Sequence, residues 1–371
     1  MSEPRLVPQP MTRVTCMVHQ HFEREVAERL AELGIRDILV ENARCVRQRI
    51  RKRAWGLLGQ AKSLDDSPMD VFRLSVPREA AGRVAGLLIE AAELKAPGHG
   101  MLYTQDIAEY GCTEPPVIEA AAAPAGMLRD MALLTCILSM PGSGDSLAKV
   151  ALALGVGVPV ICRGVGTGLR NRLGLLRITI PPEKEIVRFL IPAHDANGIR
   201  RLLIEEGRMD RPGAGFLYQT PIREGIADPL MCIGPQGHAA SMEQVIAALD
   251  DLKGGTGWRK RFAGIEDRPE EVDRRTRRHF REIYFSCAEG NAEDLVRAAM
   301  ENGAGGATTA TADCLRTGRS EEGGGARETG ILCVPDQVAD AVLHALAEAA
   351  ARCGDQALRV QVVEAPAVFT H

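Results

Sequence analysis

A short glycine-rich pattern occurs twice in this chain and constrains its fold more than any other feature of the sequence. "APGHGMLYTQDI" occupies residues 96–107, and "RPGAGFLYQTPI" occupies residues 211–222, about 115 residues further on. Both stretches contain Pro-Gly-x-Gly, two apolar residues, a tyrosine and a polar pair, and both end in isoleucine. Glycines before an apolar run are typical of a tight turn that leads into a strand. The recurrence predicts that the chain repeats one folding unit.

The residues around the two turns have matching patterns. β-Branched and apolar runs predict strands at 68–77 and 183–193, and apolar residues at helical spacing predict helices at 78–94 and 196–208. A strand–helix–strand pattern precedes each of these halves. In both copies a cysteine follows a threonine in the first strand, at Cys16 and Cys136, and a second cysteine, Cys45 or Cys162, lies 29 or 26 residues later.

A third and fainter copy follows the same order of elements. Its cysteines, Cys287 and Cys314, lie 27 residues apart. We interpret these cysteines as small buried residues at shared core positions. The predicted fold class is α+β, with three tandem ferredoxin-like βαββαβ units that form an intramolecular pseudo-trimer. The predicted boundaries are 12–108, 131–222 and 279–368, with a helix-containing linker at 223–278.

Composition excludes several classes of function. The formal net charge of −4 lacks the basic excess of a nucleic-acid-binding protein. No apolar run approaches the roughly 20 residues that cross a bilayer, and the N-terminus lacks the apolar core of a signal peptide. The ten cysteines include no CxxC pair, so we expect no zinc site or other metal site. These features predict a cytoplasmic protein.

Three stretches resemble the P-II nitrogen-regulatory signalling proteins. "LALGVGVPVICRGVGTGLR" (152–170) is similar to a helix, a strand and the start of a long loop in that family, and "GRMDRPGAGFLYQTPI" (207–222) is similar to its turn and fourth strand. "ETGILCVPDQVADAVLHAL" (328–346) is similar to the strand and helix before that turn. The resemblance implies a signalling protein that binds nucleotides in clefts between units and contacts a partner through long loops.

The candidate ligand site consists of glycine-rich turns, where backbone N–H groups can approach a phosphate or another anion. The resemblance implies an effector such as ATP, ADP or AMP in clefts between the units. A tight turn without a ligand is the alternative for any single Gly-x-Gly, and Met101 and Phe216 stand where the family has a basic residue. The candidate ligand-binding residues are Gly98, His99, Gly100, Gly164, Val165, Gly166, Thr167, Arg170, Gly213, Ala214 and Gly215.

The first long connection, at about 48–68, begins with the basic stretch "RCVRQRIRKR". Such a stretch is either a solvated segment or a docking arm for an acidic partner, a phosphate or a membrane surface. The resemblance implies a protein partner such as a membrane transporter or a metabolic enzyme, which would place the protein at a membrane through that partner. A monomeric pseudo-trimer or a small homo-oligomer is expected. The candidate partner-binding residues are Arg47, Arg49, Arg51, Arg53 and Arg172.

No catalytic signature is recognisable in the sequence. The eight histidines are scattered, and the closest pair, His19 and His21, lacks a third ligand, so a surface pair is favoured over a metal site. We therefore expect a regulatory protein and not an enzyme. Two alternatives stay open: a ligand-independent scaffold of the same fold, and a nucleotide-acting enzyme.

Overall fold

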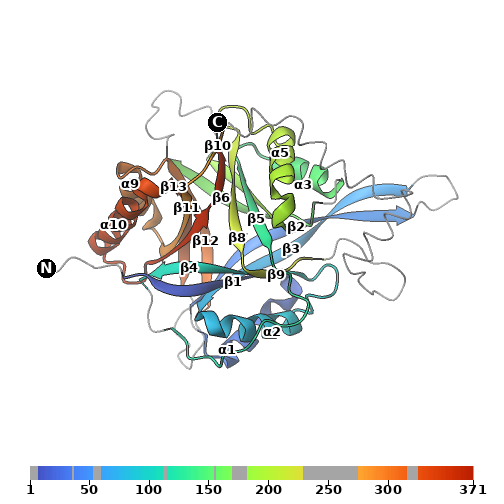
Figure 1. Ribbon diagram of the computed structural model, residues 1–371, viewed down its shortest axis with the longest axis horizontal. Coiled ribbons are helices and arrows are strands. Elements are labelled where there is room, and N and C mark those ends of the chain that lie inside the picture. Colours follow the sequence, from blue (N-terminus) through green and yellow to red (C-terminus); the bar gives the residue numbers. More distant parts are fainter. Residues whose placement is uncertain are drawn as a thin grey trace.

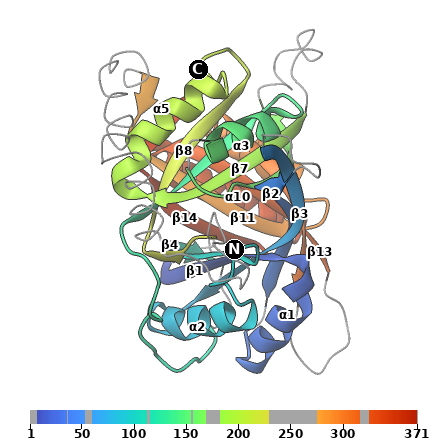
Figure 2. The ribbon, with the colours of Figure 1, turned by 90° about the vertical axis from the view of Figure 1, so that its right-hand side faces the viewer.

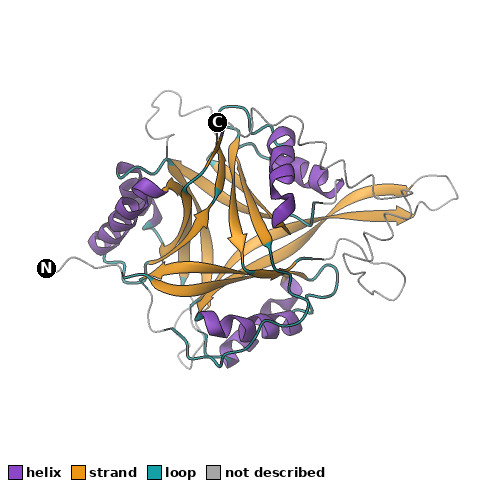
Figure 3. Ribbon diagram, in the orientation of Figure 1, coloured by secondary structure: helices purple, strands orange, loops and turns teal. Residues whose placement is uncertain are grey.

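A computed structural model describes residues 7–35, 37–52, 60–111, 115–153, 156–168, 182–228, 275–315 and 325–370. These residues form six α-helices and a sheet of 15 strands, joined throughout by antiparallel pairing. The predicted mixed α+β class is therefore confirmed. The strands occupy the centre of the molecule, and the helices lie outside them in three pairs (Figures 1 and 3).

The first segment, residues 9–110, has a central strand with two faces of different character. Val14, Cys16 and Val18 in β1 are fully buried under the helices, whereas the alternate residues face the centre of the molecule. Its strands follow the spatial order β4-β1-β3-β2. The elements are β1 (Gln9–His19), α1 (Glu23–Glu32), β2 (Ile38–Lys52), β3 (Gln60–Val76), α2 (Ala81–Ala91) and β4 (Gly100–Tyr110).

The second and third segments, residues 131–226 and 276–370, repeat this strand order as β8-β5-β7-β6 and β14-β11-β13-β12. The second contains β5 (Met131–Leu138), α3 (Ser143–Ala153), β6 (Val160–Gly168), β7 (Glu183–Pro192), α5 (Ala196–Glu206), β8 (Gly215–Ile222) and β9 (Glu224–Ile226). The third contains β10 (Thr276–Arg277), β11 (Phe280–Ala288), α9 (Ala292–Glu301), β12 (Gly306–Leu315), β13 (Ala326–Pro335), α10 (Asp336–Cys353), β14 (Arg359–Ala365) and β15 (Ala367–Thr370).

The three segments are joined by strand pairing at both ends of each four-strand set. At one end, β2, β6 and β12 pair with one another. At the other end, β9 of the second segment pairs with β4, β15 of the third pairs with β8, and the end of β4 pairs with β14. The pairing therefore runs from segment to segment around the molecule. The turned view shows the α1–α2 and α3–α5 pairs on opposite sides of the strands (Figure 2).

The buried cysteines occupy two kinds of core. Cys16, Cys136 and Cys287 lie in three separate clusters, each between one segment's strands and its own helices. Burial raises the pKa of all three thiols, to about 12 for Cys287. The second set, Cys45, Cys162 and Cys314, lies in one central cluster shared by the three segments. The interpretation of the cysteines as core residues is therefore confirmed.

The connection expected at about 48–68 is largely a β-hairpin. β2 and β3 pair from Leu39 opposite Arg73 out to Lys52 opposite Gln60, and the hairpin projects beyond the rest of the molecule (Figure 1). Arg44 in β2 forms an ion pair with Asp66 in β3 at 3.1 Å. Cross-strand pairs of opposite charge stabilise antiparallel strands.

Parts of the other connections lie outside the described residues. They are 169–181 between β6 and β7, 316–324 between β12 and β13, and 229–274, which covers most of the linker expected at 223–278 and so most of the region where its helix was expected. Residues 119–127 are described and run along α2, and Ala121 N–H donates to the carbonyl of Glu79, just before that helix, at 3.2 Å. Within the described residues, none of the helices has the length and apolar character to span a bilayer.

We predict that Gly100→Ala destabilises the fold. Gly100 begins β4 with φ +139°, and a Cβ at this position would lie 1.9 Å from the carbonyl oxygen of Met17 in β1. Because backbone and not a flexible side chain blocks the Cβ, we expect a loss of at least about 2 kcal/mol in the free energy of unfolding, measured by urea denaturation.

The matched control for this substitution is Gly305→Ala. Gly305 is exposed, and a Cβ there would meet no atom within 4 Å. We expect its unfolding free energy to change by no more than about 0.5 kcal/mol. Equal effects of the two substitutions would contradict the close approach of β1 and β4.

Candidate functional site

The two glycine-rich turns fold in the same way. In the first turn, the His99 amide donates to the Ala96 carbonyl at 3.4 Å, and the His99 carbonyl accepts from the His19 amide at 2.9 Å. The second turn, residues 211–215, repeats both bonds at 3.1 and 2.9 Å, the second of them from the Ser139 amide. Gly98 and Gly213 have φ values of +97° and +76°, which favour glycine. The repeated sequence therefore produces a repeated turn.

The first turn lies at the boundary between the first and second segments. Arg47 in β2 approaches the turn, with its Nη1 3.3 Å from the position of a Cβ on Gly98. Asp228 follows β9 of the second segment, forms an ion pair with Arg47, and accepts a hydrogen bond from the Gly98 amide at 3.1 Å. The side chain of Asp228 is 1% exposed. Of the predicted ligand residues, Gly98 and His99 thus adjoin an ion pair between segments.

Histidine rings lie near the first turn. The His99 ring lies 4.7 Å from the ring of Phe22, measured between centroids, and its Nδ1 lies 3.2 Å from the Ala92 carbonyl oxygen. Burial and the nearby His21, His99 and Arg47 lower the pKa of His19. Because desolvation, the largest of these causes, disfavours the charged imidazole, the lowered pKa favours neutral His19.

Four other predicted ligand residues, Gly164 to Thr167, lie in β6, which pairs with β12 and β7. A Cβ at Gly164 would lie 2.8 Å from the Thr308 side chain, and a Cβ at Gly166 would lie 2.3 Å from the Lys184 side chain. These glycines therefore permit close strand packing within the sheet. Likewise, a Cβ at Gly215 would lie 2.3 Å from the Ile137 carbonyl oxygen. The ligand-binding role of these residues stays a prediction.

The predicted partner-binding arginines lie on different parts of the chain. Arg47 lies beside the first turn and is 20% exposed. Arg49 and Arg51 belong to β2, in the outer part of the hairpin. The remaining two, Arg53 and Arg172, lie outside the described residues, as does the predicted ligand residue Arg170. A docking role for these arginines stays a prediction.

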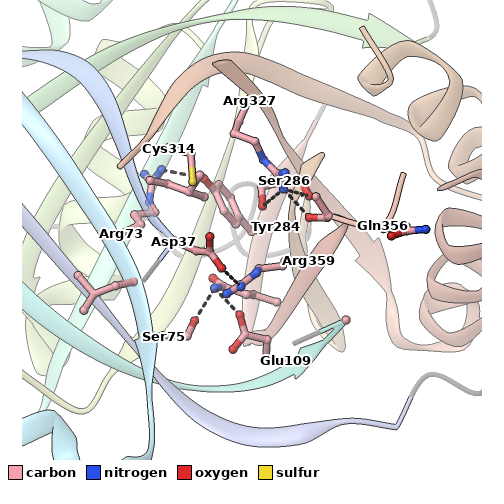
Figure 4. A pocket seen from close by; sticks show the side chains of 15 residues that line it. Asp37, Arg73, Ser75, Glu109, Tyr284, Ser286, Cys314, Arg327, Gln356 and Arg359 are labelled. Carbon is pink, nitrogen blue, oxygen red and sulfur yellow. Dashed lines mark hydrogen bonds and ion pairs between the residues drawn. The ribbon is translucent and has the colours of Figure 1, made fainter. Parts of the chain in front are cut away.

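A cavity of about 130 Å³ lies between the first and third segments, and we call this place the third cleft (Figure 4). Its walls come from β3 and β4 of the first segment, from β11, β13 and β14 of the third, and from the turn after α10. The ionisable side chains that line it are Asp37, Arg73, Glu109, Tyr284, Cys314, Arg327 and Arg359. A cavity of this size holds roughly ten waters, which suits a small polar ligand or the head group of a larger one.

Two of the three arginines in this cavity are neutralised by carboxylates. Arg359 is ion-paired with Asp37, and Arg73 is ion-paired with Glu41. Arg327 in β13 differs, because the hydrogen bonds of its guanidinium go to the Ala357 carbonyl and to the carbonyl and hydroxyl oxygens of Ser286. Within the described residues, its charge is thus stabilised by dipoles and not by a carboxylate.

The opposite wall of the cavity contains a buried carboxylate. Glu109 in β4 is 1% exposed, and its Oε1 accepts from Gln361 Nε2 at 3.2 Å. Its Oε2 has no hydrogen-bond partner among the described residues. Gln361 Nε2 also donates to Ser75 Oγ at 2.7 Å, which fixes the amide between the two segments. The cavity therefore offers a cation on one wall and an acceptor on the other (Figure 4).

A buried charge network lies next to this cavity. Burial opposes ionisation of Glu41, but Arg73 and Arg188 and hydrogen bonds from Arg73 and Tyr284 hold the pKa of Glu41 below its usual value. Tyr284 OH donates to Glu41 at 3.0 Å across the segment boundary. Removing one partner of such a buried pair typically costs about 3–5 kcal/mol.

Sequence reasoning missed the residues of the third cleft. Arg327 and Glu109 belong to different segments and are more than 200 positions apart, so no local motif joins them. Arg359 could have been named as a candidate from the sequence, because it begins the fourth strand of the third segment. The third copy contains no Gly-x-Gly turn before its fourth strand, so it offered no glycine motif that would predict a ligand site. Within the described residues, no three His, Cys, Asp or Glu side chains are close enough to hold a metal ion.

Comparison with known proteins gives limited information. No protein-family model matches the chain, and no curated protein matches it. Among solved structures, GlnK of B. subtilis is similar at 12% identity and a TM-score of 0.23, over 27% of this chain and 88% of that chain. The GlnK–ATP complex of B. subtilis has the same identity and TM-score, over 27% of this chain and 86% of that chain. Similarity at this level establishes neither a fold nor a function for this chain.

We predict a pH-dependent stabilisation by Asp70→Asn. Asp70 in β3 is buried beside Gln20, and burial raises the pKa of this carboxyl from 3.8 to about 6, against a lowering hydrogen bond from Gln20. The folded state therefore binds a proton more tightly than the unfolded state, and wild-type stability falls as pH rises from about 4 to about 6. At pH 7.5 the variant should be more stable by on the order of 1–2 kcal/mol.

Urea denaturation across pH 4 to 7.5 measures this difference, which should shrink toward pH 4. The control is Glu301→Gln, which removes an exposed carboxylate at the end of α9. We expect no comparable pH-dependent gain for the control. A gain for Asp70→Asn that is equal at both ends of the pH range would contradict the raised pKa.

Proposed function

We propose that this chain is a regulatory protein composed of three tandem P-II-like units that form a pseudo-trimer, and that it binds a small effector between units. The threefold recurrence of one strand order and the pairing between segments support this arrangement. The observation that carries the ligand proposal is Arg327, a half-buried guanidinium beside the cavity. Among the described residues, its hydrogen-bond partners are all neutral oxygens.

The proposed effector has an anionic group that faces Arg327 and a hydrogen-bond donor that faces Glu109. A guanidinium–anion hydrogen bond in a partly buried site is stronger than one between neutral groups. A donor from the ligand would satisfy Glu109 Oε2, which is costly to leave buried and unpartnered. Adenine nucleotides carry both kinds of group, as do many small hydroxy or amino acids.

The effector would act on a partner through the β2–β3 hairpin. β2 begins directly after Asp37, which is ion-paired with Arg359 at the third cleft. An anion in this cleft would compete with Asp37 for Arg359 and so alter the contacts at the base of β2. A ligand shifts such an equilibrium only through its different affinity for the two arrangements. The protein partner, such as a transporter or a metabolic enzyme, would contact the projecting hairpin.

A ligand-independent scaffold is the second candidate function. One observation favours it: Arg47 beside the first turn and Arg359 in the third cleft are each already paired with a carboxylate. Stable binding of a partner to the hairpin, without any effector, would support the scaffold function. We propose no enzymatic activity, and turnover of a nucleotide by the isolated protein would revive that alternative.

The test is a binding screen with a matched pair of variants. Calorimetry and thermal-shift scans would use ATP, ADP, AMP, cyclic AMP, bicarbonate and phosphate on the full chain. For an anion that binds, Arg327→Gln should weaken the affinity by about 10–100-fold, as expected for a charge-assisted hydrogen bond. Arg352→Gln, an exposed arginine in the last turn of α10, should leave the affinity unchanged.

Two results would contradict the effector proposal. One is the absence of binding by every anion in the panel. The other is a bound anion whose affinity is the same in the Arg327→Gln and wild-type proteins. Circular dichroism of both variants separates loss of binding from loss of fold.

A further inference from the structure

A second and larger cavity lies between the second and third segments, and we call it the α5 cavity. Its volume is about 590 Å³, which is in the usual range for small-molecule sites, roughly 300–1,000 Å³. Its walls come from α5 and β8 of the second segment and from β10, β11, β15 and the start of α10 in the third. It shares no lining residue with the third cleft.

Helix α5 contributes a basic face to this cavity. Asn197, Arg200 and Arg201 all line it, and their spacing of three and four residues places them on one side of the helix. Arg200 is 5% exposed. A charge that is this far removed from water acts on a nearby ligand more strongly than the same charge in solvent.

The third segment contributes two more arginines to the cavity, Arg278 and Arg281. Arg281 is partly neutralised, because its Nε lies 3.1 Å from an oxygen of Asp336. Arg278 is exposed, and across the described parts of the chain it forms no ion pair. A bend at His279, with φ +63°, separates Arg278 from β11. The His279 carbonyl accepts from the Asp336 amide at 2.9 Å, which ties this bend to the start of α10.

The lining side chains favour an anionic ligand. Four arginines line the cavity, against the two carboxylates of Asp336 and Glu364. A guanidinium binds carboxylate and phosphate groups through paired hydrogen bonds of good geometry. Phe280 and Pro366 add apolar surface, which suits the carbon skeleton of an organic anion. The cavity is too large for a single carboxylate or phosphate group to fill.

We infer that the α5 cavity binds a small polyanion, a molecule with two or more carboxylate or phosphate groups. Such a ligand would contact arginines of α5 and Arg278 at the same time, and would therefore link the second segment to the third. The site goes beyond the proposed effector site, since it uses different residues and a different pair of segments. Because the two walls are apart in the unfolded chain, binding would stabilise the folded state.

Calorimetry and thermal-shift scans of the full chain at low salt test the inference. Citrate and pyrophosphate are the probes, and sodium chloride at equal ionic strength is the control. We expect at least one probe to bind with one-to-one stoichiometry and to raise the Tm by about 3 °C or more at a hundredfold excess over Kd. The tighter probe identifies the anionic group that the site prefers. Binding of neither probe would overturn the inference, as would binding of an acidic peptide alone.

Charge variants locate the site. Arg278→Gln should weaken the affinity by about fivefold or more, because a charge-assisted hydrogen bond is lost. Glu364→Gln removes a lining carboxylate, so we expect it to strengthen the affinity by about two- to fivefold. The matched control is Arg277→Gln, which removes an exposed arginine of β10 that does not line the cavity. This control should leave the affinity unchanged.

The outcomes for this site and for the third cleft are separate. Arg327→Gln should leave the affinity for citrate or pyrophosphate at the α5 cavity unchanged, so either site can fail without the other. Equal losses in Arg277→Gln and Arg278→Gln would overturn the inference, because they would indicate attraction by the general surface charge. Circular dichroism of each variant shows whether the fold is retained.

Discussion

The pairing of β2, β6 and β12 with one another determines how the three segments are placed relative to one another. In an isolated four-strand set, each of these strands would be an exposed edge with unpaired backbone groups, which favours aggregation. Here each of the three pairs with the other two, and β9, β15 and the end of β4 continue the pairing at the opposite ends. This pairing also determines where the boundaries between segments lie. At each boundary, a terminal strand of one segment meets a turn of another.

Buried ion pairs fix how the strands of one segment align with those of another, and burying these charges costs desolvation free energy. Arg13 of the first segment pairs with Glu282 of the third at 2.7 Å, with both side chains 5% exposed. Burial opposes ionisation of Glu282, but Arg13 and hydrogen bonds from Arg13 and Tyr218 lower its pKa. Since a buried ion pair adds little net stability over a well-packed apolar pair, these residues are better explained by specificity. A sheet shifted by one residue would leave Glu282 buried without its guanidinium.

The helices, the strands and the two glycine-rich turns could be predicted from the sequence, but the residues of the third cleft could not. Helices and strands were predictable because periodicity is local, and the cysteines marked equivalent positions in three cores. The hairpin of β2 and β3 was predicted as a loop, because its stability depends on charge pairs such as Arg44–Asp66 that form only once the strands are in register. Gly164 and Gly166 suggested an anion site, but a Gly-x-Gly pattern does not say what lies against the glycines. In the structure, the side chains of Thr308 and Lys184 lie there, and no ligand is needed to explain the pattern.

A single chain with three segments can give each cleft a different chemistry, which a symmetric homotrimer cannot do. At the boundary of the first and second segments, Asp228 accepts a hydrogen bond from the Gly-x-Gly turn. The corresponding turn of the second segment has an exposed glycine, Gly213. The third segment lacks that turn, and Arg327 and Glu109 lie on opposite walls of the cavity that it forms with the first segment. The β2–β3 hairpin belongs to the first segment alone, and the ion pair of Asp37 with Arg359 links the base of β2 to that cavity.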